Sequence, residues 1–79
     1  MFKIIDIFHS SFGCVLRVEG DSAINYFPKC GDKFIMEDDE VEIIGVIFES
    51  FELNLFDIVV DKVVSKFNIG NESKTIEKQ

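Results

Sequence analysis

The sequence predicts a single all-β domain folded as a small closed β-barrel. Short runs rich in β-branched and aromatic residues are separated by turn residues at spacings of roughly 8–12 positions, which is typical of small barrels and sandwiches. No run combines a clear helical period with a convincing N-terminal cap. The 79 residues are 47% apolar and include nine phenylalanines, so one domain of this length has enough apolar material for a core.

The first two runs predict a β-hairpin. Residues 2–8 alternate in a way that would place one set on a single strand face: Phe2, Ile4, Asp6 and Phe8. The turn at residues 9–13 ends in Gly13, which tolerates positive φ. Residues 14–19 follow as a second strand, with a common face formed by Cys14, Leu16 and Val18.

The middle of the chain predicts two further strands. The turn block 28–32, with its proline and glycine, precedes a short strand at residues 33–36. Residues 41–48 form the most apolar run, which indicates a central strand. Gly45 inside that run indicates a bulge or the close approach of another backbone.

Residues 51–67 fit both a strand and a helix. A strand through about residues 56–64 is favoured, because four valines and an isoleucine are poor helix formers. From Asn68 onward the chain is polar. We therefore expect a β-barrel domain at residues 1–67 and a disordered or frayed C-terminal tail at residues 68–79.

Negative charge is concentrated in one part of the chain. The formal net charge is −7, from 15 acidic and 8 basic residues. Nine of the acidic residues and none of the basic ones lie between Phe34 and Asp61. Such a stretch is either an ordinary solvated surface or a negative docking face for a basic protein. The same acidity makes nucleic acid an unlikely partner, because phosphate binding needs clustered lysine and arginine.

The order of several short motifs resembles the second domain of translational GTPases such as elongation factor Tu. These motifs are Phe2-x-Ile4-x-Asp6-Ile7-Phe8, the run from Gly13 to Gly20, Cys30-Gly31-Asp32-Lys33-Phe34, and Val41-x-Ile43-Ile44-Gly45-Val46. The resemblance implies a closed barrel of the translation-protein type over residues 1–64. It also implies docking to RNA or to neighbouring protein domains. The phosphate-binding GxxxxGK[ST] loop of the GTPases is absent, so nucleotide chemistry does not carry over.

We expect a non-enzymatic, cytoplasmic protein-binding module. Its most specific form is an immunity or inhibitor protein that masks the active surface of a basic, nuclease-type toxin. Phe51 is the leading apolar anchor, with Phe48 and Tyr26 as further candidates. The alternative is an accessory barrel of translation or ribonucleoprotein machinery, which would contact its partner through lysines. The expected partner-binding residues are Glu37, Asp38, Asp39, Glu40, Glu42, Glu49, Phe51, Glu52 and Asp57.

Other chemistries find little support in the sequence. His9, Ser10 and Cys14 are near one another along the chain, but nothing indicates the cleft that catalysis requires. The acidic run at residues 37–40 lacks the spacing and glycine of a calcium-binding loop, so we expect neither metal nor cofactor. The two cysteines are too few for a disulfide framework and are expected to be reduced. No apolar run is long enough to span a membrane, and we expect a monomer or small homo-oligomer.

Overall fold

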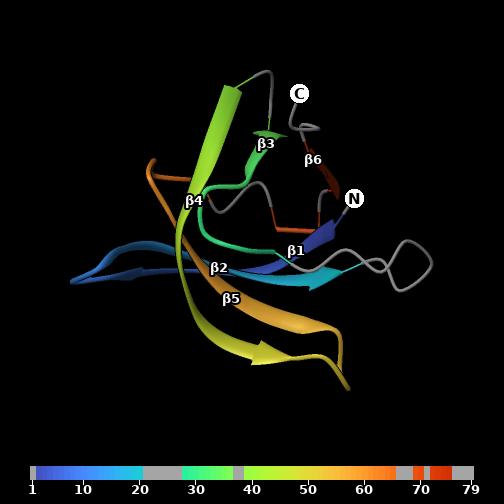
Figure 1. The fold of residues 1–79 in the computed structure, drawn as a ribbon. Coiled ribbons are helices and arrows are strands. Elements are labelled where there is room, and N and C mark those ends of the chain that lie inside the picture. The colour runs from blue at the N-terminus through green and yellow to red at the C-terminus, as the bar shows by residue number, and fades with distance from the viewer. Residues whose placement is uncertain (1, 21–27, 37–38, 66–68, 71, 76–79) are drawn as a thin grey trace.

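In the described part of the chain, six antiparallel strands close into a barrel; the structure is a computed structural model (Figure 1). The structure describes residues 2–20, 28–36, 39–65, 69–70 and 72–75. The strands are β1 (Phe2–Ser10), β2 (Gly13–Gly20), β3 (Lys33–Met36), β4 (Asp39–Ser50), β5 (Leu55–Val60) and β6 (Glu72–Thr75). Around the barrel they follow the order β1-β2-β5-β4-β3-β6, and β6 pairs again with β1. The predicted all-β barrel is confirmed.

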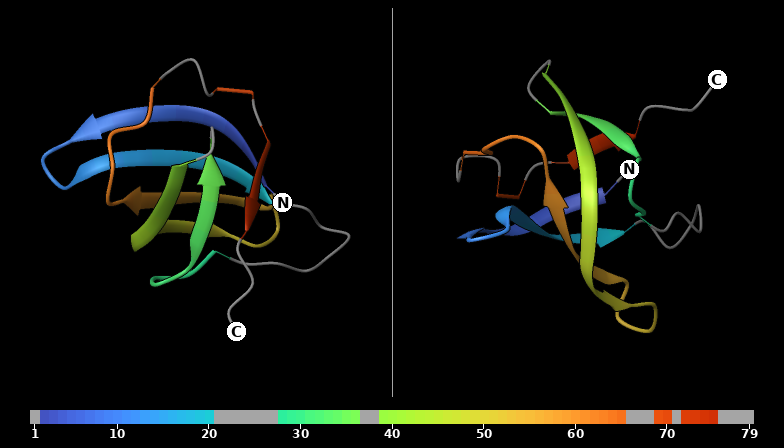
Figure 2. Two further views of the ribbon diagram at one scale, coloured as in Figure 1. Left: turned by 90° about the horizontal axis from the view of Figure 1, so that it is seen from above. Right: turned by 60° about the vertical axis from the view of Figure 1, so that its left-hand side comes forward.

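Four of the strands form one strongly curled sheet. Strands β1, β2, β5 and the second half of β4 lie side by side, as Figures 1 and 2 show. The first half of β4 bends away from this sheet and pairs with the short strand β3. The equally short β6 bridges β3 and the start of β1. Curling of this kind removes most of the free edges that a flat sheet would expose.

The segment that fits two patterns in the sequence is a strand. Strand β5 lies between β2 and β4, and five of its six residues are buried. Phe56, Ile58 and Val60 point into the barrel as part of the core cluster. The predicted strand is therefore confirmed, although it ends at Val60 rather than near Val64. Val64 is also buried, in the irregular segment that follows β5.

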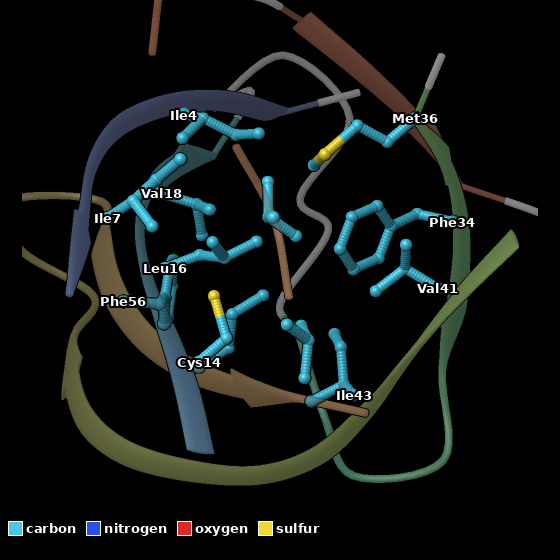
Figure 3. Close-up of a cluster of buried hydrophobic side chains, with 13 residues drawn as sticks. Ile4, Ile7, Cys14, Leu16, Val18, Phe34, Met36, Val41, Ile43 and Phe56 are labelled. Atoms are coloured by element: carbon cyan, nitrogen blue, oxygen red, sulfur yellow. The ribbon is translucent and has the colours of Figure 1, made fainter. Parts of the chain in front are cut away.

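The core is built from side chains on both walls of the barrel (Figure 3). Cys14, Leu16 and Val18 of β2 point inward as predicted. Phe34 of β3 approaches from the opposite wall and is fully buried. At about 25 cal/mol for each square ångström of apolar surface removed from water, burial of these side chains is the main stabilising contribution. Both cysteines are free thiols, as expected, with Cys14 buried and Cys30 exposed.

A bulge in β1 overturns the predicted strict alternation of its side chains. The register with β2 shifts between Ile4 and Asp6, so that Ile5 is an extra residue on β1. Ile4 and Ile7 therefore both point into the core, whereas Phe8, predicted to share a face with Ile4, is exposed. A bulge adds one residue to one strand, and every side chain beyond it changes face.

The C-terminal region is not entirely a polar tail. Residues 72–75 of the expected tail form β6, which pairs with Phe2 and Lys3 of β1 and with Phe34 and Ile35 of β3. This corrects the expectation for residues 72–75, while residues 76–79 lie outside the described residues. The sequence Glu-Ser-Lys-Thr has no apolar alternation and so gave no sign of a strand. The segment forms a strand through backbone hydrogen bonding with its two neighbours.

Candidate functional site

The acidic residues of the predicted binding region do not share one surface. Glu40 and Glu42 lie at the start of β4, around a shallow hollow that is also lined by Lys33, Asp61 and Lys62. The Lys33 ammonium is 3.4 Å from a carboxylate oxygen of Glu40. Folding thus brings lysines from outside the acidic stretch to this end of β4, and the charge there is mixed.

Asp57 is not available to a partner. Its side chain is only 12% exposed and accepts two hydrogen bonds from Arg17, at 2.9 Å from Nε and 3.1 Å from Nη2. The Arg17 guanidinium also lies over the ring of Phe8, 5.4 Å from its centroid. Hydrogen bonding to Asp57, and then the charges of Asp57 and Asp6, raise the pKa of Arg17 above its ordinary value. Asp57 therefore belongs to a structural ion pair on the outer side of the sheet.

Glu37, Asp38 and the candidate anchor Tyr26 lie outside the described residues. Asp39 is the first residue of β4 and pairs with Met36 of β3.

The remaining predicted residues gather at the other end of β4, in a segment with many exposed apolar side chains. We define the 44–53 segment as the second half of β4 and the turn that follows it. It contains no basic residue and includes the acidic residues Glu49 and Glu52. Its large apolar side chains are 47–64% exposed: Ile44, Ile47, Phe48, Phe51 and Leu53.

Two bulges in β4 produce this exposure. The register with β5 shifts between Ile43 and Gly45 and again between Val46 and Phe48. Each shift leaves one more residue on β4 than on β5, so Ile44 and Ile47 are not carried into the core. Ile43 is fully buried and Val46 packs against the core, while Ile44, Ile47 and Phe48 remain exposed. The bulges convert an apolar strand into one that presents apolar side chains outward.

The turn after β4 is held in place by the end of β2. Asn54 has a φ of 56°, and its side-chain amide donates a hydrogen bond to the carbonyl of Gly20. The Gly20 amide in turn donates to the Asn54 carbonyl at 2.9 Å. A Cβ atom on Gly20 would come within 2.8 Å of the Asn54 side-chain oxygen, so a larger residue at this position would displace the Asn54 side chain. The turn that carries Phe51 and Leu53 is therefore anchored before any partner binds.

Phe51 is supported from below by a core residue. Its ring contacts Phe56 in an edge-to-face arrangement, with 5.9 Å between centroids and 69° between planes. The side chain remains 59% exposed. The Ser50 hydroxyl accepts a hydrogen bond from the Leu53 amide at 3.2 Å, which tightens the same turn. An aromatic ring with one side on the core and the other toward solvent is a typical anchor geometry.

The carboxylates of the 44–53 segment are not neutralised within the described part of the chain. Glu49 and Glu52 are both exposed, and neither forms an ion pair with a described residue. Glu19, also exposed, lies at the end of β2 opposite Leu55, close to the anchored turn. Phe48, Phe51 and Leu53 thus sit among negative charges.

Four of the seven exposed apolar and acidic residues of the 44–53 segment were predicted from the sequence as partner contacts or candidate anchors. Glu49, Phe51 and Glu52 were identified because they lie in an acidic stretch without basic residues. The structure places them with Phe48 on one segment. Ile44, Ile47 and Leu53 were missed. For the two isoleucines the reason is that a continuous apolar run predicts burial on both faces. The bulge indicated by Gly45 is confirmed by the register shift between Ile43 and Gly45, but its effect on the exposure of Ile44 was not predicted.

No family model, curated protein or solved structure matches this chain. Within the described residues, no group of three or more His, Cys, Asp or Glu side chains is arranged to hold a metal ion. A helix with the length and apolar character needed to cross a membrane is likewise absent from that part of the chain.

Proposed function

We propose that this protein is a non-enzymatic binding module that docks a basic protein through the 44–53 segment. One observation carries the proposal: five large apolar side chains are exposed within ten residues, together with two carboxylates that form no ion pair with a described residue, and the segment contains no base. Small soluble domains seldom leave so much apolar surface on one segment unless it serves an interaction.

The arrangement matches the energetics of tight protein interfaces. A few buried aromatic or aliphatic anchors supply most of the binding free energy, and the surrounding charges supply orientation and association rate. Phe51 and Leu53 would be the anchors, because the Asn54–Gly20 contact fixes their turn and reduces the entropy lost on binding. Glu49 and Glu52 would steer a positively charged surface toward them.

In its most specific form, the module is a cytoplasmic immunity or inhibitor protein for a nuclease-type toxin. Nuclease active surfaces are basic because they bind phosphate, so an acidic cover with apolar anchors is complementary to them. A net charge of −7 on 79 residues suits such a cover.

Charge reversal at the segment tests the proposal directly. In the Glu49→Lys/Glu52→Lys variant, inhibition of a basic nuclease domain, to be sought first among the products of neighbouring genes, should fall by at least about tenfold, as each close charge pair is worth about 1.5 kcal/mol or more. Binding of the unmodified protein should also weaken as sodium chloride is raised from about 50 to about 300 mM. Affinity by titration calorimetry and residual nuclease activity measure the two effects.

The chain supplies matched controls for both kinds of contact. Glu40→Lys/Glu42→Lys makes the same change in net charge at the other end of β4 and should preserve most of the affinity. Phe12→Ala removes an exposed ring from the turn between β1 and β2, and it is the counterpart of Phe51→Ala. Equal losses of affinity in the two charge-reversal variants would show that only net charge matters. Equal losses in Phe51→Ala and Phe12→Ala would show that the position of the exposed ring does not matter. Either result would contradict the proposed site.

The translation-related alternative is supported by the barrel class and by the resemblance to the second domain of translational GTPases. Its contact surface would be formed by Lys29, Lys33, Lys62 and Lys66, of which Lys66 lies outside the described residues. Lys33 and Lys62 share their hollow with Glu40, Glu42 and Asp61, which weakens their attraction for phosphate. A gel shift with transfer RNA or ribosomal RNA at low salt would favour this alternative, and its absence would favour the acidic docking module.

A further inference from the structure

The second half of β4 has a backbone edge that no described strand covers. On one side, β4 pairs with β5 from Ile43 to Ser50. On the other side, it pairs with β3 only from Asp39 to Glu42. Ile43 then exchanges two backbone hydrogen bonds with Gly31 and Asp32, and the Ile44 carbonyl accepts one from the Cys30 thiol. Beyond Ile44, no described residue pairs with this edge.

This edge coincides with the proposed binding segment. Residues 45–50 extend for about 20 Å at the usual rise of a strand, enough for an extended segment of about six residues. The exposed side chains of Ile47 and Phe48 lie along the same stretch. An open strand edge with apolar side chains beside it is the arrangement used in recognition by strand addition.

The charge of β4 selects a basic partner over a second copy of this chain. From Asp39 to Ser50 the strand carries acidic residues and no basic one. Pairing two copies along this edge would bring two chains of net charge −7 together. A basic extended segment meets opposite charge instead.

We infer that the partner adds a basic extended segment as a strand along residues 45–50 of β4. This inference rests on the proposed function and specifies how the same segment is recognised. Main-chain hydrogen bonds to the open edge would supply affinity, while Ile47, Phe48 and Glu49 would select alternating apolar and basic side chains. The recognised chemistry is an extended peptide in which arginine or lysine alternates with an aliphatic residue.

A pair of N-methylated peptides tests the inference. The probe is an acetylated, amidated hexapeptide of alternating arginine and valine, titrated into the full-length, isotope-labelled chain and followed by NMR. Amides within residues 45–50 should shift and exchange more slowly with solvent, while those of β2 stay unchanged. In one peptide the backbone nitrogen of every second residue is methylated, and in the other peptide those of the remaining residues. One of the two peptides should bind about tenfold or more weakly than the parent, and the other should bind almost as well as the parent. That asymmetry arises because an added strand directs only every second amide toward its neighbour.

Three outcomes would overturn the inference. In the first, both methylated peptides bind as tightly as the parent, which indicates electrostatic attraction without strand addition. In the second, the peptide does not bind, or it binds without slower amide exchange at residues 45–50. In the third, sedimentation shows that the chain occupies this edge with a second copy of itself. The proposed function has its own readout, since loss of nuclease inhibition in Glu49→Lys/Glu52→Lys but not in Glu40→Lys/Glu42→Lys would still support basic docking.

Discussion

At the scale of single residues, the ion pair between Arg17 and Asp57 shows how pairing within the fold makes a charged side chain unavailable to a binding partner. The two residues pair directly across β2 and β5, and the planar guanidinium meets the carboxylate through two nitrogens. Asp57 is largely buried, whereas the Arg17 side chain is 42% exposed. The carboxylate therefore depends on the arginine for its hydrogen bonds far more than the arginine depends on the carboxylate.

This imbalance predicts unequal effects of removing either partner. Arg17→Ala leaves a buried carboxylate without its two donors, so it should lower the midpoint of urea unfolding clearly. Asp57→Ala leaves a guanidinium that water can reach, and its effect should be the smaller of the two. Paired urea titrations of the variants measure the difference. If Asp57→Ala proved the more damaging, the ion pair would not be the reason for burying that carboxylate.

At the scale of the structural element, the bulges of β4 decide which isoleucines stabilise the barrel. Ile43, Ile44 and Ile47 occur within five positions of one strand, yet only Ile43 is buried. Replacement by threonine keeps the β-branched shape and so nearly preserves strand propensity. The same substitution therefore compares burial at three neighbouring positions.

Ile43→Thr should cost roughly 2–4 kcal/mol of unfolding free energy, because it deletes buried methylene surface and buries a hydroxyl. Ile44→Thr and Ile47→Thr should each remain within about 0.5 kcal/mol of the parent protein. Guanidinium titrations of the three variants provide the values. Equal losses at all three positions would mean that β4 is buried on both faces, as its composition alone suggests.

Strand β4 also shows why the sequence predicted the positions of the strands better than which of their side chains point into the core. Composition and spacing identified the runs that became β1 to β5, because strand propensity and turn chemistry are local properties. Gly45 indicated the bulge beside it, whereas the bulges at Ile5 and Ile47 depend on register with neighbouring strands and have no such local signal. Strand β6 escaped prediction for a related reason, since its polar sequence carries no apolar alternation. The acidic residues were recognised from the sequence. That they lie in two separate groups, one at each end of β4, became visible only from the path of that strand.

At the scale of the whole molecule, closure of the barrel depends on very few pairs. Strand β6 contributes two paired positions to β1 and two to β3, and it is the one link between those strands in the described part of the chain. The Gly70 amide adds a hydrogen bond to the Ile4 carbonyl just before it, at 2.7 Å. Phe34, the fully buried ring on the far wall, belongs to the strand that β6 ties to β1.

Two truncated chains measure what this closure contributes. A chain ending at Gly70 lacks β6 and should lose roughly 2–4 kcal/mol of unfolding free energy, at about 1 kcal/mol for each lost backbone hydrogen bond. A chain ending at Thr75 keeps β6 and should unfold at the same urea concentration as the full sequence. Both chains retain the complete 44–53 segment, so the longer one should also bind a basic partner normally. If the two truncated chains unfolded together with the parent, β6 would be dispensable, and the curled sheet of β1, β2, β5 and β4 would be the true unit of stability.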